Sequence, residues 1–226
     1  MKKIKFFVVA ALLTISSGVN AQFSSSQSKS ISTNDSSGEW SSVWLEYNAV
    51  NIDFNQGIDD ETTTGFSAGF SKAYSITAGT PLFLEAGLGV QYFTKSDFLD
   101  TDDVNFSMIS AKVPVNLIYE FYLPNSNIKI DPFVGLTFRY NITGTISNDK
   151  DDKNIFDKDD MGSSDYTFKR FQAGWQVGVK ARFGGGFSAG IAYGSDFSNI
   201  WEPKVQGGSK VKANVGMTTL TIGYSF

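Results

Sequence analysis

Hydrophobic and polar residues alternate along most of the chain after residue 40. In the run 82–92, Leu82 and every second residue up to Tyr92 is apolar, whereas Glu85 and Gln91 occupy intervening positions. Successive side chains of an extended strand point to opposite faces, so this alternation predicts strands with one apolar face. The pattern predicts eight strands, near residues 43–54, 63–72, 82–92, 109–121, 128–140, 171–183, 187–196 and 211–226.

Strand length and connection length distinguish a transmembrane β-barrel from a soluble all-β domain, since both show such alternation. The predicted strands run to roughly 10 to 15 residues, whereas strands of soluble domains are nearer about 5 or 6. Short turns near residues 79–81, 124–127 and 184–186 alternate with longer loops, and aromatic residues end many apolar faces. Transmembrane barrels combine these features, while a soluble lipocalin-like barrel would turn its apolar faces inward. The sequence therefore predicts an all-β fold, an eight-stranded antiparallel up-and-down transmembrane β-barrel over residues 40–226.

The last predicted strand carries Leu220, Ile222, Tyr224 and Phe226 on one face and small or polar residues on the other. It resembles the insertion signal of bacterial outer-membrane β-barrels, although a soluble β-sandwich could also end in an aromatic strand. The region from residue 40 onward resembles the small outer-membrane barrel families, such as the OmpA and OmpX types and the outer-membrane-protein β-barrel domain family. This resemblance implies a place in the bacterial outer membrane, with outer-membrane lipid and the barrel assembly machinery as partners. It carries no catalytic motif.

The amino-terminal segment has the composition of a secretory signal. Three lysines precede an apolar run at residues 6–15, and small residues near Ala21 suit cleavage. A membrane anchor is the alternative, but the apolar run is short for one. Residues 22–39 are rich in serine and poor in apolar residues, which predicts a flexible leader. The expected organisation is a signal peptide at 1–21, a leader at 22–39 and a barrel at 40–226.

Charged residues recur at positions that would face the lumen if the apolar faces meet lipid. Charges inside a narrow lumen are costly to desolvate singly, so we expect them to pair. Arg182 with Asp131 and Lys129 with Glu120 are the candidate pairs, because counting back from the short turns gives them similar depth. The alternative is that the charges stay separately solvated in a water-filled pore. The predicted lumen charge network comprises Glu46, Glu85, Lys112, Glu120, Lys129, Asp131, Arg139, Lys180, Arg182 and Asp196.

Residue composition limits the chemistry. The chain has no histidine and no cysteine, which excludes nucleophile–histidine catalysis, zinc sites built on these residues and disulfides. Asp157, Asp159, Gly162 and Asp165 match part of a calcium loop, but two of its other ligand positions hold Met161 and Phe168, so a solvated loop is favoured. The net charge of −4 argues against a nucleic-acid partner. We expect no cofactor, no metal and no enzymatic activity.

Residues that interrupt the alternation leave the course or the limits of three predicted strands undecided, and they predict a break in a fourth strand. After Ala49 the apolar residues move from odd-numbered to even-numbered positions, which predicts a bulge or an exit from the membrane. Lys72 occupies a position on the apolar face of the second strand, so this strand is expected to end or bulge there. Pro114 removes one ladder donor, which predicts a local break or bulge. The last strand begins near Val211 with apolar residues such as Val215 on the polar parity, and its start is left open.

Two functions remain open. Eight strands leave a lumen that side chains nearly fill, whereas a porin needs about 16 strands. The first hypothesis is therefore a non-enzymatic outer-membrane barrel with a filled lumen, structural or adhesive through external loops that would bind an extracellular ligand. The alternative is a narrow pore, or porin-like channel, for ions or small solutes.

Overall fold

The computed structural model describes residues 38–54, 60–76, 79–98, 101, 103–148, 151–163, 167–202 and 212–226, which lie in one compact unit. The expected signal peptide, almost all of the expected leader, and Asp165 and Val211 lie outside the described residues. The strands of the described part are β1 (Trp40–Phe54), β2 (Glu61–Ser75), β3 (Leu82–Lys95), β4 (Asn105–Tyr119), β5 (Phe121–Tyr122), β6 (Lys129–Ser147), β7 (Asp152–Asn154), β8 (Phe171–Arg182), β9 (Phe187–Asp196) and β10 (Ala213–Ser225).

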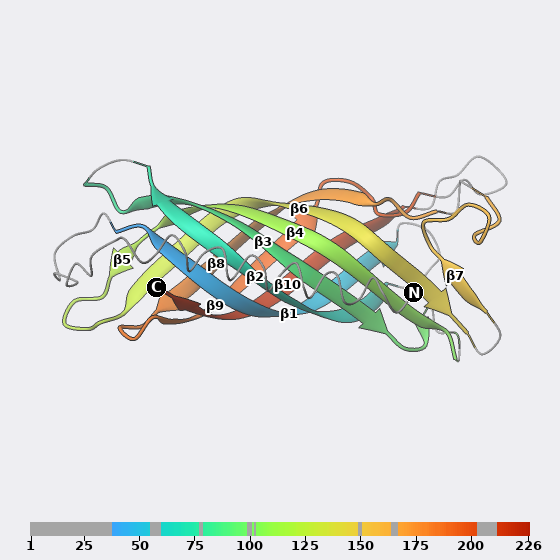
Figure 1. The fold of residues 1–226 in the computed structure, drawn as a ribbon, viewed down its shortest axis with the longest axis horizontal. Coiled ribbons are helices and arrows are strands. Elements are labelled where there is room, and N and C mark those ends of the chain that lie inside the picture. Colours follow the sequence, from blue (N-terminus) through green and yellow to red (C-terminus); the bar gives the residue numbers. More distant parts are fainter. Residues whose placement is uncertain are drawn as a thin grey trace, which may run out of the picture. The chain divides into compact units, whose positions relative to one another are not determined.

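Eight long strands of the described region form one closed antiparallel sheet. Each pairs with its neighbour along the chain, and β1 closes the ring by pairing with β10, with Ser42 opposite Ser225 and Phe54 opposite Ala213. The short β5 and β7 pair with β6 beside this ring. Figure 1 shows the strands running obliquely past one another, as a closed barrel requires. The predicted eight-stranded up-and-down barrel is thereby confirmed.

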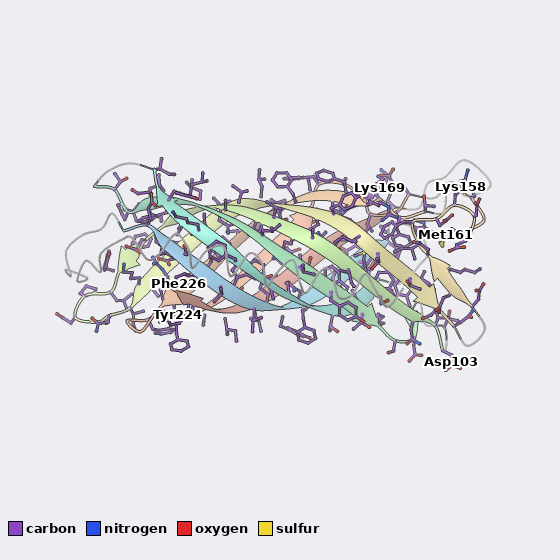
Figure 2. All side chains as sticks on the ribbon, viewed as in Figure 1. Asp103, Lys158, Met161, Lys169, Tyr224 and Phe226 are labelled. Atoms are coloured by element: carbon purple, nitrogen blue, oxygen red, sulfur yellow. The ribbon has the colours of Figure 1, made fainter. Side chains whose placement is uncertain are left out.

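The two ends of the barrel differ in their connections. We call the end with the predicted short turns and the carboxy-terminus the turn end, and the opposite end the loop end. Gly79, Asn125 and Gly186 have positive φ angles in the three short connections, where the chain reverses tightly. Figure 2 places Tyr224 and Phe226 at the turn end and Lys158, Met161 and Lys169 at the loop end.

Apolar side chains cover the outside of the barrel between these ends. Along β3, alternate residues from Leu84 to Tyr92 face outward, and Leu84, Leu88 and Tyr92 are each more than 40% exposed. From Leu82 to Tyr92 a strand tilted by about 45° rises roughly 24 Å, which matches the apolar band of about 25 Å in membrane barrels. Aromatic pairs lie at both margins of this band: Tyr47 with Phe66 at one and Phe187 with Tyr224 at the other. No described helix is long and apolar enough to span a membrane.

Three expected irregularities are resolved by the strand registers. β1 keeps one register through Ala49 and Val50, so the bulge, one of the two predicted alternatives, is absent. The inward face itself becomes apolar, with Val50 and Ile52 buried, which agrees with the other alternative, an exit from the membrane. β2 continues through Lys72 to Ser75 in register, because the lysine reaches Glu39 at 3.4 Å from the outer surface. The expectation that β2 ends or bulges at Lys72 is therefore wrong.

At Pro114 the β3–β4 ladder omits two pairs and resumes in the same register, so the predicted break is present without a bulge. The register does shift elsewhere, where Ile109 faces Thr143 but Ser110 faces Asn141. β6 extends to Ser147 and pairs with β7, so the strand continues beyond its predicted end near residue 140 through residues 143–147.

Candidate functional site

The lumen is the candidate functional site because it gathers the predicted charged residues. At the turn end, Arg182 forms ion pairs with both Asp131 and Glu120, and Lys129 lies 3.3 Å from Glu120. The guanidinium carbon of Arg182 lies 3.6 Å from the ring centroid of Trp40. The β6–β8 register brings this group together by placing Lys129 opposite Arg182 and Asp131 opposite Lys180. Four charges and the Trp40 indole lie at this end, packed beside a buried apolar cluster that includes Phe83 and Ile118.

A second group lies around Glu85, which is 3% exposed. Lys180 Nζ donates to both carboxylate oxygens of Glu85, at 2.9 and 2.7 Å. Ser71 Oγ and Asn116 Nδ2 donate to the same carboxylate at 2.8 and 2.9 Å. Glu85 comes from β3 and Lys180 from β8, which do not pair, so this ion pair bridges the lumen. Four donated hydrogen bonds offset much of the cost of burying the carboxylate.

Further along the lumen, Glu46 pairs with the buried Lys112 at 2.7 Å. Lys112 Nζ also lies 5.5 Å from the ring centroid of Trp44. Gly69 and Gly89 make room for that indole, since a Cβ added at either would lie within 2.5 Å of a Trp44 ring atom. Glycine at these two positions therefore allows a tryptophan to occupy the interior of a narrow barrel.

Arg139 and Asp196 form the next ion pair, and both side chains are almost fully buried. Uncharged polar groups accompany it: Asn48 donates to Ser67 at 2.7 Å and accepts from Thr219 at 3.0 Å. All ten residues of the predicted network thus lie in ion pairs with partners of opposite charge.

The loop end of the lumen is filled by an apolar cluster that the sequence interpretation missed. Its buried members are Val50, Ile52, Phe93, Phe98, Phe106, Met108, Ile155, Ile200, Ala213 and Val215. Two features of the sequence indicate this cluster. The apolar residues move to the opposite face of the strand after Ala49, and the apolar Val215 lies on the otherwise polar face of the last strand. Both mark an inward face that changes from polar to apolar.

Segments of the long connections complete the wall around this cluster. Backbone hydrogen bonds run from Ile155 N to Gly144 O, from Phe168 N to Ile155 O, from Lys169 N to Ile200 O and from Ile200 N to Ala213 O. They bridge from β6 to β10 above the ends of the shorter β8 and β9. Ile155 and Ile200 contribute buried side chains to the cluster, so these loop segments are parts of the barrel core.

The spaces found among the described luminal side chains are small. A cavity of about 40 Å³ lies among the side chains of the turn-end half, next to Trp44, Glu85 and Arg182. At about 10 to 15 Å³ for each water, this space holds about three water molecules. A second space, among Val50, Phe93 and Phe168 of the apolar cluster, measures about 20 Å³. Neither space approaches the size of a solute pathway.

Other predicted site residues lie outside the lumen. Leu220, Ile222, Tyr224 and Phe226 are exposed on the outer surface, on the face expected for the insertion signal. In the suggested calcium loop, Asp157 Oδ1 accepts a hydrogen bond from the backbone N–H of Asp159 at 2.9 Å. Among the described residues no group of three or more acidic side chains is placed to hold a metal ion.

The closed barrel, its apolar outer band and its packed polar interior define a small integral β-barrel protein of the bacterial outer membrane. The chain belongs to the outer membrane protein beta-barrel domain family, whose model matches residues 7–226.

No curated protein matches the chain in sequence. Solved structures that resemble it include Ail, the attachment invasion locus protein of Yersinia pestis, at 13% identity over 83% of this chain and 98% of that chain, with a TM-score of 0.43. Neisserial surface protein A matches at 16% identity over 81% and 97% of the two chains, with a TM-score of 0.46. The outer membrane enzyme PagL matches at 15% identity over 79% and 98%, with a TM-score of 0.44.

Proposed function

We propose that this protein is a sealed, non-enzymatic outer-membrane barrel that acts structurally or adhesively through its external loops. The observation that carries this proposal is the interior: paired charges and buried apolar side chains such as Phe83 and Ile118 fill one half of the lumen, and the apolar cluster of the loop end fills the other. A pathway for solutes would need mobile or separately solvated charges. Here each charge has a close partner, and an indole lies between the ion pairs.

The energy needed to open the lumen favours the sealed barrel over the narrow pore. Opening a path past Glu85 and Lys180 would break a buried pair that also holds Ser71 and Asn116. Breaking a buried ion pair costs about 3–5 kcal/mol. An ion that cleared this barrier would next meet the apolar cluster, where nothing replaces its hydration.

The location of the loops supports a role at the cell surface. Short turns face the periplasm in transmembrane barrels, while longer loops face outside. We therefore assign the turn end to the periplasm and the loop end to the exterior. Because Ile155 and Ile200 anchor the loop segments in the apolar cluster, the external surface is held in shape and can present a fixed face to a ligand.

Catalysis has no supporting arrangement among the described residues. The chain lacks histidine, and the luminal carboxylates are occupied by ion pairs. PagL, one of the similar structures, is described as an enzyme, but the low identity carries none of its residues onto this chain.

Single-channel conductance in planar bilayers tests the sealed barrel. The purified wild-type protein should give no stable conductance, whereas a variant that combines Lys180→Ala and Trp44→Ala with Phe93→Ala should give frequent openings, because it removes side chains from both filled halves of the lumen. Frequent wild-type conductance would instead support the narrow pore. Adhesion is tested separately by comparing the binding of intact cells to host and matrix proteins before and after replacement of the exposed loop residues Lys158 and Asp159 with serine, which leaves the buried Ile155 in place.

A further inference from the structure

The ion pair of Glu85 and Lys180 is in direct contact with a side-chain amide. Glu85 Oε2 accepts hydrogen bonds from Lys180 Nζ at 2.7 Å and from Asn116 Nδ2 at 2.9 Å. An amine and a carboxamide therefore meet at one carboxylate oxygen. The group contains a nucleophile, an amide carbon that it can attack, and an acid–base group that touches both nitrogens. These are the parts needed to form an amide bond between two side chains.

The sheet brings these side chains together from three strands. Glu85 of β3 and Asn116 of β4 are direct cross-strand partners, and Lys180 comes from β8, on the other side of β6. Gly135 of β6 leaves room for the amide, because a Cβ there would lie 2.2 Å from Asn116 Oδ1. Gly190 of β9 leaves room for the lysine, because a Cβ there would lie 2.9 Å from Lys180 Cγ. The two glycines therefore provide the space in which both side chains meet Glu85.

The carbonyl oxygen of Asn116 has a hydrogen-bond donor of its own. Gln176 Nε2 donates to Asn116 Oδ1 at 2.6 Å. A carboxylate only accepts, so Asn116 must turn Nδ2 toward Glu85 and Oδ1 toward Gln176. A donor at the carbonyl oxygen stabilises the negative charge that develops there when a nucleophile attacks the carbon. The amide is thus held with its nitrogen on an acid–base group and its oxygen on a donor.

The surroundings reduce the cost of removing the charge from the amine. Glu85 and Asn116 are each only 3% exposed, and the apolar side chains of Ile118 and Phe133 line the same space. A proton that passes from Lys180 to Glu85 along their hydrogen bond leaves two neutral groups. Because burial penalises charges and not neutral groups, this transfer costs less here than it would in water.

We propose that Lys180 and Asn116 form an intramolecular isopeptide bond across the lumen, with Glu85 as the proton carrier. Lys180 gives one proton to Glu85, and its neutral Nζ attacks Asn116 Cγ. The Nζ–Cγ bond forms and the Cγ–Nδ2 bond breaks. Glu85 passes its proton to Nδ2 while it accepts a second proton from Nζ, and Nδ2 leaves as ammonia.

The products contain no buried charge at this position. Glu85 ends as a neutral acid beside a neutral amide, where a carboxylate and an ammonium stood before. The step takes place once in each chain and turns over no external substrate, so the barrel remains non-enzymatic. The inference is independent of the proposed function, because it concerns how the lumen is held together and not what the loops bind.

Tryptic peptide mapping of the barrel purified from the outer membrane tests the proposal. Trypsin cleaves after lysine and arginine, so an unlinked chain gives the separate fragments 113–129 and 171–180. The isopeptide bond removes the cleavage point at Lys180 and joins 113–129 to 171–182. We expect this linked product, lighter by one molecule of ammonia than its two parts together. After boiling, the linked chain should also run faster on a denaturing gel, because it contains a closed loop.

Four variants separate the bond from the ion pair. Lys180→Arg keeps a cation beside Glu85 but has no amine, so the linked product should disappear while the barrel still folds. Glu85→Gln should also lose the product. Gln176→Leu should slow its formation in refolded protein by roughly 100-fold, which is the effect of removing one donor of this kind. Lys129→Arg, at the turn end, is the matched control and should leave the product unchanged.

The wild type alone decides the main question. If barrel from the outer membrane, and refolded barrel after long incubation, both give only the fragments 113–129 and 171–180, the proposal is wrong. A linked product that persists in Glu85→Gln would remove Glu85 from the reaction. Should Glu85→Gln not fold, the comparison of the wild type with Lys180→Arg still distinguishes the covalent bond from a simple ion pair.

Discussion

Replacing Arg182 with alanine should destabilise the barrel more than any single change of an exposed charge. The guanidinium pairs with Asp131 and Glu120, and these carboxylates are only 1% and 3% exposed. Without Arg182, Asp131 loses its direct partner, and Glu120 keeps only Lys129, at 3.3 Å. Leaving a buried charge uncompensated costs about 3–5 kcal/mol. The lost contact with the Trp40 ring adds about 0.5–2 kcal/mol.

The expected shift in melting temperature follows from chain size. A chain of 150–250 residues changes Tm by about 2–4 °C for each kcal/mol, so the two costs together, about 3.5–7 kcal/mol, correspond to a fall of about 7–28 °C. Heat-modifiability on gels and circular dichroism melts in detergent would measure this fall.

The neighbouring Lys129 provides the matched control. Its side chain is 35% exposed, so Lys129→Ala should cost at most about 1 kcal/mol. Arg182→Met combined with Asp131→Asn and Glu120→Gln should recover much of the stability, since no buried charge is then left alone. Equal melting temperatures for Arg182→Ala and Lys129→Ala would refute the idea that Arg182 stabilises the barrel by compensating buried carboxylates.

Three further outcomes follow. Gly69→Val should abolish the folded, heat-modifiable barrel because its Cβ would lie 2.3 Å from an indole atom in the lumen, whereas Gly38→Val, with nothing within 4 Å, should fold normally; a stable Gly69→Val barrel would contradict that packing. Phe93→Ala should cost about 3–5 kcal/mol in urea unfolding without creating conductance, since the charge network still fills the other half; a conducting variant would show that the apolar cluster alone seals the lumen. In whole cells an impermeant maleimide should label a cysteine at Asp157 and not one at Asn125, and the reverse pattern would invert the orientation.

Period-two alternation made most of the fold predictable from the sequence. It located all eight membrane strands because lipid demands an unbroken apolar outer face, and short turns fixed neighbouring registers closely enough to pair Arg182 with Asp131. The pair of Glu85 and Lys180 could not be found in this way, because β3 and β8 meet only across the lumen. Its formation depends on barrel curvature and on long side chains, which a one-dimensional pattern does not encode.

The loop end was harder to predict for a different reason. Outside the membrane the rule that apolar residues face outward no longer holds, so Val50, Ile52 and Val215 looked like irregularities. They are regular positions of a wall whose surroundings change from lipid to water. The strand extension at 143–147 was hidden likewise, since its outward threonines gave it the composition of a loop.

The backbone bonds that complete the loop-end wall also constrain the order in which the molecule can form. They lead from Gly144 of β6 to Ala213 of β10 through loop residues that include Ile155 and Ile200. The ring of the wall therefore closes only after β6 and β10 are both in place. Each of these bonds spans only 11 to 31 residues, but together they make a wall only when the strands at both of its ends have formed. We therefore expect refolding to have two kinetic phases, with early burial of the membrane band and late protection of the Ile155 and Ile200 amides from hydrogen exchange.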